Sequence, residues 1–270
     1  MRLSRTLLIC TFLFMGWASV AEPPAGSHQG HAYGEAQAAP VPGLDPLKDA
    51  GVPEADRLKA VAEDASVAAG LWKAIRLCDR CLAANDLAAL LAERPASELQ
   101  PLATELAAAV AQDGAPVIRA AAARALMSLP VEKRPESVRA LAPRELATTC
   151  VPSRMAWDPR EFTVTAGELV RLRMENPDSM QHNMLLTAPG SLSEIGVAAE
   201  KMGEGLEGKR RQFVPDSVKV RAVMGLVEPG KTGELWFFAP DKPGTWVLVC
   251  TYPGHYRMMN GKLRVKAATP

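Results

Sequence analysis

The stretch from Cys250 to Met259 constrains this chain more than any other, because it places three different metal-binding side chains in one short loop. It reads Cys-Thr-Tyr-Pro-Gly-His-Tyr-Arg-Met-Met, so that Cys250, His255 and Met259 are spaced by five and then four residues. Pro253 and Gly254 supply the fixed φ and the permissive φ that a tight turn requires. A thiolate, an imidazole and a thioether in one turn predict a site for a metal ion that accepts soft ligands.

A second imidazole has to come from elsewhere in the chain. Copper sites for electron transfer take two His and one Cys in a trigonal set, with a weak axial Met. The chain has only four histidines: His28, His31, His182 and His255. His182 stands in a Met-Gln-His-Asn segment within a predicted strand, whereas the first two lie in a segment rich in Pro and Gly. His182 is therefore the candidate that completes the set.

Residues 151–267 resemble azurin and plastocyanin, the cupredoxins, in two motifs that occur in the expected order. The Cys-Thr-aromatic-Pro-Gly-His-x-x-x-Met string is similar to the azurin ligand loop, and Met-x-His-Asn is similar to its first ligand strand. The resemblance implies one type 1 copper that cycles between Cu(I) and Cu(II). It implies these ligands: His182, Cys250 and His255 in the equatorial plane, and Met259 on the axis.

The same resemblance gives roles to residues around the ligands. Asn183 and Thr251 are expected beside the site, with Asn183 linking the two ligand segments and stabilising the thiolate. Gln181 stands where azurin has Gly, so we expect a four-coordinate site without a carbonyl contact. Met258 competes with Met259 for the axial position, but the azurin spacing favours Met259.

By resemblance, the function is electron transfer with a redox protein partner, a cytochrome or a copper enzyme. The electron is expected to leave through the outer ring edge of His255, which should reach the surface. An apolar docking patch is expected around that edge: Met180, Tyr252, Pro253 and Met258. An enzyme is not expected, because a copper oxidase or nitrite reductase needs further copper sites and the chain has few His to build them.

Two other functions stay open. One is a copper carrier or storage module, which the Met pair at 258–259 and the His pair at 28 and 31 would suit. The other is a helical scaffold protein in which the copper fold is only structural. Zinc is the main rival ion, although thioether sulfur is a poor ligand for it and its structural sites usually close with a fourth Cys or His.

The C-terminal half has the pattern of an all-β Greek-key sandwich. Short runs such as 160–165 and 168–175 alternate apolar and polar residues, and turn signals separate them. Seven or eight such strands fit within 151–267, which is typical of a sandwich. One helix is expected between them, over 191–202, with Ser191 and Glu194 as a capping box.

The preceding residues, 53–148, predict a separate all-α domain, either a helical bundle or a HEAT-like pair of helices. They are rich in Ala and Leu at helical spacing. The segment 117–129 resembles the second helix of a HEAT-type repeat, and Pro116 suits the first turn of that helix. Its role is expected to be docking or spacing.

The N-terminus has the features of an exported protein. Residues 1–21 predict a signal peptide, with Arg2 and Arg5 before an apolar core, and residues 22–52 predict a flexible linker. We therefore expect a periplasmic or secreted protein, without a membrane span once the signal is removed. The 31 basic residues less these two arginines, against 30 acidic ones, leave a net charge of −1, which does not indicate nucleic acid.

Apart from Cys10 in the predicted signal peptide, three further cysteines have no role in the copper motif. Cys78 and Cys81 form a Cys-x-x-Cys pair, but Leu82 follows where covalent haem attachment needs His. With Cys150 they make an odd set, and an oxidising compartment favours a disulfide among them. Buried thiols and a second metal or redox site are the alternatives.

Overall fold

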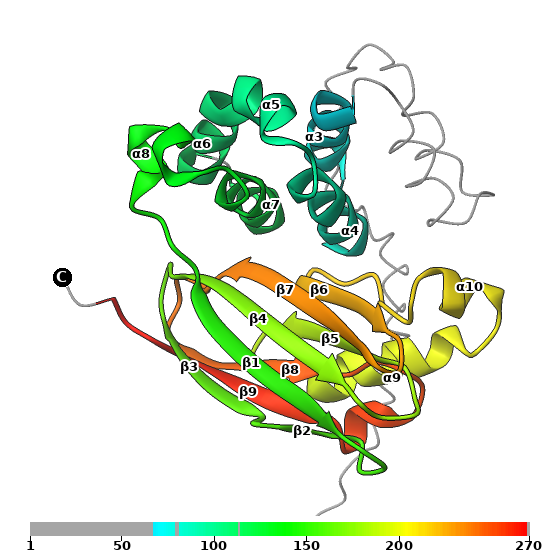
Figure 1. The fold of residues 1–270 in the computed structure, drawn as a ribbon. Coiled ribbons are helices and arrows are strands. Elements are labelled where there is room, and N and C mark those ends of the chain that lie inside the picture. Colours follow the sequence, from blue (N-terminus) through cyan, green and yellow to red (C-terminus); the bar gives the residue numbers. More distant parts are fainter. Residues whose placement is uncertain (1–66, 79–80, 113, 269–270) are drawn as a thin grey trace, which may run out of the picture. The chain divides into compact units, whose positions relative to one another are not determined.

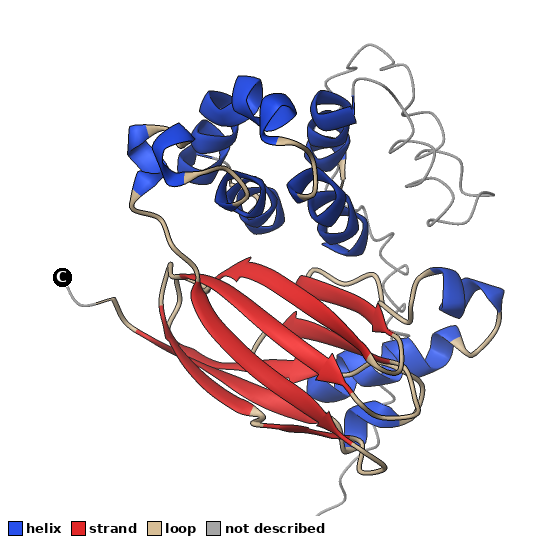
Figure 2. Ribbon diagram, viewed as in Figure 1, coloured by secondary structure: helices blue, strands red, loops and turns tan. Residues whose placement is uncertain are grey.

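The computed structural model describes residues 67–268 except 79–80 and 113. All of these residues belong to one compact unit, Pro40–Pro270. Up to residue 139 the described chain is helical, and from residue 144 it forms mainly strands, with the two kinds of element distinguished in Figure 2. The predicted signal peptide, the linker with His28 and His31, and the first part of the helical domain (53–66) lie outside the described residues.

The helical region consists of short helices joined by tight connections (Figure 1). Its elements are α3 (Val67–Leu77), α4 (Cys81–Ala92), α5 (Ala96–Leu99), η1 (Gln100–Leu102), α6 (Ala103–Gln112), α7 (Pro116–Met127), η2 (Val131–Lys133) and α8 (Glu136–Arg139). Pro116 occupies the first turn of α7, where a missing N–H costs no bond within the helix. The predicted helical region is thus confirmed, whereas the HEAT-like arrangement stays a prediction.

One apolar core joins these helices to the sheet that follows them. Leu71, Leu87 and Leu126 lie fully buried within it, on α3, α4 and α7. Trp236 and Phe238, which belong to a strand, pack into the same cluster. The helical region therefore shares its core with the sandwich and is not merely tethered to it.

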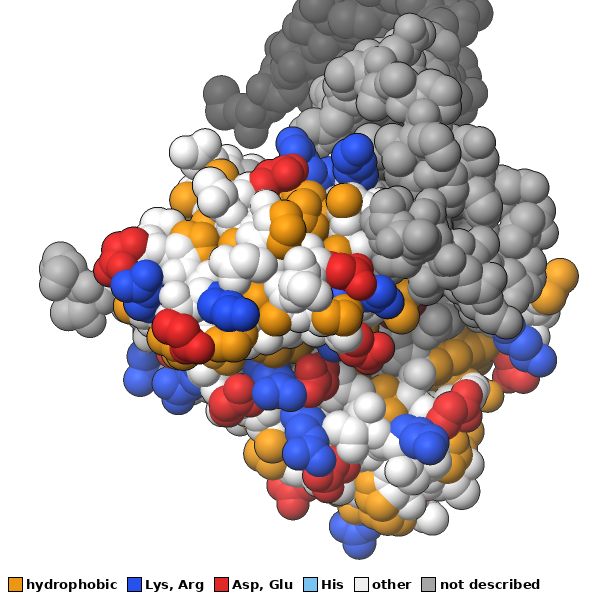
Figure 3. All heavy atoms as spheres, turned by 45° about the horizontal axis from the view of Figure 1, so that its top comes forward, with side chains coloured by type: hydrophobic (Ala, Val, Ile, Leu, Met, Phe, Trp, Pro, Cys, Tyr) orange, Lys and Arg blue, Asp and Glu red, His pale blue; other side chains and the backbone are white. Residues whose placement is uncertain are grey.

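The face formed by the helices carries charges of both signs (Figure 3). Lys and Arg side chains alternate there with Asp and Glu, and several pair, among them Arg76 with Glu105 at 3.2 Å and Arg94 with Glu98 at 2.6 Å. Exposed pairs of this kind contribute little to stability, because solvent screens their charges. This mixture is typical of a solvated surface.

The strands form a two-layered sandwich, which confirms the predicted fold class. They are β1 (Arg144–Val151), β2 (Ala156–Asp158), β3 (Glu161–Thr165), β4 (Leu169–Asn176), β5 (His182–Thr187), β6 (Val220–Val227), β7 (Lys231–Phe238), β8 (Gly244–Val249) and β9 (Asn260–Lys266). One sheet has the order β2-β1-β4-β7 and the other β3-β9-β8-β5-β6. Strands that follow one another in sequence change sheets repeatedly, as in a Greek key. The pairs β1/β4 and β3/β9 are parallel and the others antiparallel.

The sandwich begins earlier than residue 151, where the sequence predicts its start. Strand β1 spans Arg144–Val151 and pairs with β4 over its first six residues. Thr148 and Cys150 point inward and are buried, while the residue between them is half-buried. The segment's apolar and polar residues come in pairs and do not alternate, so the sequence pattern does not identify a strand; the pairing with β4 does.

A helical segment between β5 and β6 supports the loop of Cys250. It contains α9 (Leu192–Met202) and α10 (Leu206–Arg210), and α9 contacts η3 (His255–Arg257). Gly196 of α9 lies so close to the Tyr256 ring that a Cβ there would overlap it. The predicted helix over 191–202 is confirmed, and its glycine allows the close approach to η3.

The predicted capping box of that helix is wrong. Ser191 occupies the N-cap position, but its side chain makes no cap hydrogen bond. Its Oγ instead donates to Ala188 O at 2.6 Å and lies 2.8 Å from Thr187 Oγ1, while Glu194 pairs with Lys219. Burial of Ser191 against β5 draws the hydroxyl away from the helix end.

Cys81 and Cys150 both carry free thiols, so neither forms the disulfide that the sequence favours. Cys150 lies fully buried on β1. Burial, and next the nearby Cys250, raise the pKa of its thiol to about 12. Cys150 is therefore a neutral, buried thiol, one of the alternatives open from sequence.

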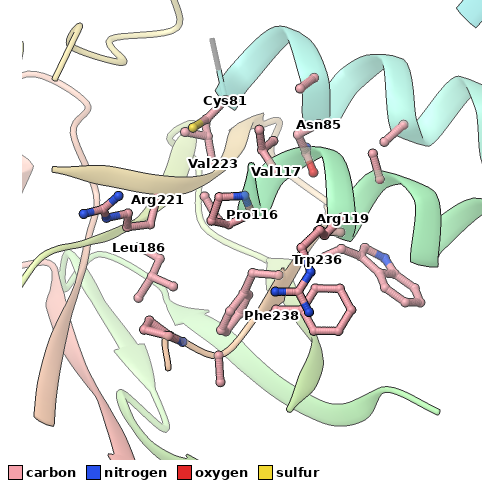
Figure 4. Close-up of a pocket in the computed structure, with 18 of the residues that line it drawn as sticks. Cys81, Asn85, Pro116, Val117, Arg119, Leu186, Arg221, Val223, Trp236 and Phe238 are labelled. Carbon is pink, nitrogen blue, oxygen red and sulfur yellow. The ribbon is translucent and has the colours of Figure 1, made fainter. Parts of the chain in front are cut away.

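A cavity of about 290 Å³ lies where α4 and α7 meet β6 and β7 (Figure 4). Val117 and Arg119 of α7 border it, and Trp236 and Phe238 of β7 form an aromatic wall. The guanidinium carbon of Arg119 stands 4.4 Å from the centre of the Phe238 ring. The helices thus cover this part of the sheet without filling it.

None of the helices that the structure describes combines the length and the apolar character needed to cross a bilayer.

We expect Leu126→Ala to lower the free energy of unfolding of the metal-free protein by about 2–5 kcal/mol, because it opens a cavity in the shared core. Urea denaturation followed by circular dichroism measures this change. Leu206→Ala is the matched control: that side chain is 74% exposed and its loss should cost less than about 0.5 kcal/mol. Equal effects of the two substitutions would contradict the shared core.

Candidate metal centre

The ligand loop is closed at its base by the pairing of β8 with β9. Val249 and Asn260 are the last partners of this antiparallel pair, and beyond them the Cys250 N–H donates to Met259 O at 3.0 Å. Cys250 and Met259 therefore lie side by side although nine positions separate them in sequence. Both side chains are fully buried.

Within the loop, one left-handed residue turns the chain back toward Cys250. Gly254 has φ +82°, a conformation that side chains disfavour. The His255 N–H then donates to Tyr252 O at 3.0 Å, and the Met259 N–H donates to His255 O at 2.8 Å. The Pro-Gly turn predicted from sequence thus determines where His255 lies.

The structure brings three of the predicted ligands together. His182 is the first residue of β5, which pairs with β8. Its Nδ1 lies 3.9 Å from Cys250 Sγ, and Nδ1 of His255 lies 3.6 Å from the same sulfur. The three donor atoms are all within 4.8 Å of one another, and the three residues are buried. Two nitrogens and one sulfur thus face a common point.

Of the two axial candidates, the structure buries one and exposes the other. Met259 is fully buried and belongs to the core cluster that contains Cys250. Met258 is 56% exposed. Met259 is therefore the axial candidate that lies inside the sandwich, whereas Met258 lies at the surface.

Without a metal, the three ligand side chains are neutral near pH 7. Burial raises the pKa of the Cys250 thiol to about 12, although backbone N–H groups of Tyr252 and Asn183 oppose this rise. Burial, and next the charge of His182, lower the pKa of His255 to about 4. Burial also lowers the pKa of His182. Neutral imidazoles are the form that binds metal, and a metal ion must displace the thiol proton.

Asn183 joins the two segments that carry the ligands. Its Nδ2 donates to Thr251 Oγ1 at 2.8 Å, and its Oδ1 accepts from the Thr251 N–H at 2.7 Å. The same Nδ2 donates to Gln212 O at 2.8 Å. The residue after His182 is thereby connected to the residue after Cys250, which limits the relative motion of the two ligands.

Asp178 is a residue of this site that sequence analysis missed. Its Oδ2 lies 3.1 Å from His182 Nε2, and its Oδ1 accepts from the N–H groups of Ser153 at 3.2 Å and Ser179 at 2.7 Å. Burial would raise the pKa of this carboxyl, but these hydrogen bonds outweigh burial and lower it. The available signal was an acidic residue in the turn four positions before a ligand His, since carboxylates commonly orient such rings.

The structure corrects one expectation about the surface. His255 is only 1% exposed, so its outer ring edge does not reach solvent. The Tyr252 ring lies against it, with centroids 4.8 Å apart. Nε2 of His255 is buried and has no hydrogen-bond partner among the described residues. Met180 and Met258 are exposed and Tyr252 and Pro253 half-buried, so the predicted patch residues reach the surface although His255 does not.

The donor set fits copper better than zinc. Two imidazole Nδ1 atoms that converge on a buried cysteine sulfur, with the buried Met259 in the same core cluster as that cysteine, match the ligands of a type 1 site. Structural zinc is usually closed by a fourth Cys or His. Within the described residues only His182, Cys250 and His255 converge in this way.

Comparison with known proteins points to the same metal. A family model described as copper binding proteins, plastocyanin/azurin family, matches residues 145–266. Auracyanin-A of Chloroflexus aurantiacus is 34% identical over 113 residues, which cover 41% of this chain and 67% of that protein. Auracyanin-B of the same organism is 31% identical over 121 residues, which cover 42% of this chain and 48% of that protein. The chain thus spans about half the length of the second relative.

A solved structure of Auracyanin A, described as a "blue" copper protein, also aligns with this chain. The alignment covers 46% of this chain and all of that one, with 32% identity and a TM-score of 0.42.

We expect Asn183→Ala to destabilise the metal-free protein by about 1–3 kcal/mol, because it leaves the buried Thr251 N–H without its acceptor. Urea denaturation measures the loss. Gln181→Ala, which removes only a surface contact with Glu228, should change stability by less than about 0.5 kcal/mol. A loss at Asn183 no larger than that at Gln181 would refute the connection between the ligand segments.

Proposed function

Because this chain belongs to the plastocyanin/azurin family of copper-binding proteins, we propose that it transfers electrons through one type 1 copper held by His182, Cys250, His255 and Met259. One observation carries the proposal. Two Nδ1 atoms and one Sγ, all buried, converge from two strand ends and one turn. This is the trigonal donor set that copper uses for electron transfer.

Bound copper supplies a one-electron change between Cu(II) and Cu(I). The chain contributes a donor geometry that moves little during that change. His182 is held by β5, and Cys250 and Met259 are held by the paired ends of β8 and β9. Donors attached to paired strands cannot rearrange freely, so the site favours a small reorganisation on electron transfer.

The chain also controls the environment of the thiolate. Backbone N–H groups of Tyr252 and Asn183 point to Cys250 Sγ and stabilise its anionic form. The four proposed ligands are essentially inaccessible to solvent. Exclusion of water keeps the sulfur from competing reactions and tunes the reduction potential.

We place the docking surface for the redox partner at Met180, Tyr252, Pro253 and Met258. Met180 and Met258 are the exposed apolar side chains next to the ligand segments. Tyr252 connects this surface to the site, since its ring contacts that of His255. A small apolar contact suits partners that must separate after each transfer. The electron path therefore includes the covering Tyr252 layer.

The remaining assignments complete the proposal. The partner is a redox protein, a cytochrome or a copper enzyme, and the chain itself is not an enzyme. Residues 1–21 direct export as a signal peptide, residues 22–52 act as a linker, and the protein works in a periplasm or outside the cell. The charged start and apolar core of the N-terminus support export.

Adding Cu(II) to the purified metal-free protein should produce an intense visible band from thiolate-to-copper charge transfer. Cys250→Ser should abolish the band, since it removes the sulfur. Cys150→Ala, which removes the other fully buried thiol of the sandwich, should keep it. Absence of the band in the unmodified protein, measured by visible absorption, would refute type 1 copper.

Met258→Glu should slow electron self-exchange between two copies of the protein by about fivefold or more, the scale of about 1 kcal/mol at an interface residue. In the complex of two copies that exchange an electron, the two patches then face each other with negative charges. Line broadening in NMR spectra of partly oxidised samples measures the rate. Val218→Glu is the matched control, because Val218 is 88% exposed and is not part of the proposed patch. An unchanged rate for Met258→Glu would exclude the patch.

A further inference from the structure

The two ring nitrogens of His182 face two different groups, a carboxylate and a cysteine sulfur. Nε2 lies 3.1 Å from Asp178 Oδ2, and Nδ1 lies 3.9 Å from Cys250 Sγ. A neutral imidazole carries one proton, on either nitrogen. An ionised carboxylate can only accept a hydrogen bond, so its position at Nε2 requires the proton there. Nδ1 is then left with a lone pair that faces the sulfur.

We propose that Asp178 is a positioning residue that fixes His182 in the tautomer with a free Nδ1, before any metal binds. The inference rests on the proposed function in naming copper as the ion that uses Nδ1. The tautomer itself is a property of the metal-free chain. Preset donors spare the protein a proton shift and a ring rotation when the metal arrives.

The carboxylate of Asp178 is held so that it cannot turn away from the ring. Its Oδ1 accepts from the N–H groups of Ser153, in the β1–β2 turn, and of Ser179. Ser153 adopts φ +60°, which is uncommon for a residue with a side chain. The two fixed backbone donors thus occupy one oxygen, and the other is left for His182.

Asn176 holds the backbone of the same turn. Its Oδ1 accepts from the Asp178 N–H at 3.2 Å. Its Nδ2 donates to Met180 O and to Val227 O, each at 2.8 Å. Asn176 is buried at the end of β4, and these hydrogen bonds connect the turn that carries Asp178 to both β4 and β6. The turn is built as part of the sandwich rather than as a loose connection.

The second imidazole, that of His255, has no comparable hydrogen-bond partner among the described residues. Nε2 of His255 is buried without a hydrogen-bond partner among the described residues. His255 therefore provides an internal comparison: both imidazoles present Nδ1 to the same sulfur, and only that of His182 is oriented by a carboxylate.

Asp178→Asn tests the proposal sharply, because the surroundings determine which way the new amide points. The two backbone N–H groups at the Oδ1 position require an acceptor, so the amide oxygen takes that place. The amide NH₂ then faces Nε2 of His182 and donates to it. The ring is driven to the opposite tautomer, with a proton on Nδ1 directed at Cys250 Sγ.

The first experiment records two-bond ¹H–¹⁵N correlation spectra of the full-length, metal-free protein with ¹⁵N-labelled histidine at neutral pH. His182 should carry its proton on Nε2 in the unmodified chain and on Nδ1 in Asp178→Asn. Asp216→Asn, the same change at an exposed aspartate, should leave the tautomer as it is. A proton on Nδ1 in the unmodified chain overturns the proposal, even if Asp178→Asn fails to fold. An unchanged tautomer in folded Asp178→Asn overturns it as well.

The second experiment measures Cu(II) affinity by competition with a chelator. Asp178→Asn should lose about 10–100-fold, the usual effect of removing a partner of a metal-binding His. Asp178→Ala presents no donor to Nε2 and should lose less than Asp178→Asn; the reverse order contradicts the orientation argument. If the unmodified chain has the Nε2 proton but gives no blue band, the proposed function fails and this inference stands.

Discussion

The antiparallel pairing of β8 with β9 is the constraint on which the rest of the site depends. It closes the ligand loop at the Cys250–Met259 hydrogen bond, so two residues separated by a long turn lie side by side. The Pro-Gly turn then folds back so that His255 Nδ1 lies 3.6 Å from Cys250 Sγ. The neighbouring strand β5, which pairs with β8, delivers His182 from the other side. Sheet register, rather than any single side chain, thus sets the donor geometry.

Burial gives this geometry its chemistry. The four ligand side chains lie in the sandwich interior, where charge is costly, so the thiol and both imidazoles are neutral until a cation arrives. Buried polar groups around them are satisfied by specific partners, Asn183 with Thr251 and Asp178 with His182. These bonds hold the ligands in place through contacts that belong to the sheet rather than to the metal.

The helical region packs against the sheet that contains β7. Trp236 and Phe238 of β7 pack into the same core as Leu87 and Leu126, so the helices and that strand stabilise one another. Strand β7 pairs with β4, and the turn after β4 carries Asp178. A route of ordinary packing therefore connects the helices to the ligand His182. This connection gives the helical region a structural part in the β-sandwich.

Sequence alone brought out the candidate ligands, because Cys250, His255 and Met259 lie within ten residues around a Pro-Gly turn and the resemblance to azurin adds His182. It also determined the sandwich and the helix over 191–202, since both depend on local periodicity. Only the tertiary structure decided the rest. Asp178 is oriented by Ser153, 25 positions away, and β1 is recognised by its pairing with β4. His255 is covered by Tyr252, and Ser191 bonds to β5 instead of capping its helix. Each of these depends on which distant groups meet, and a linear pattern of residue types does not contain that information.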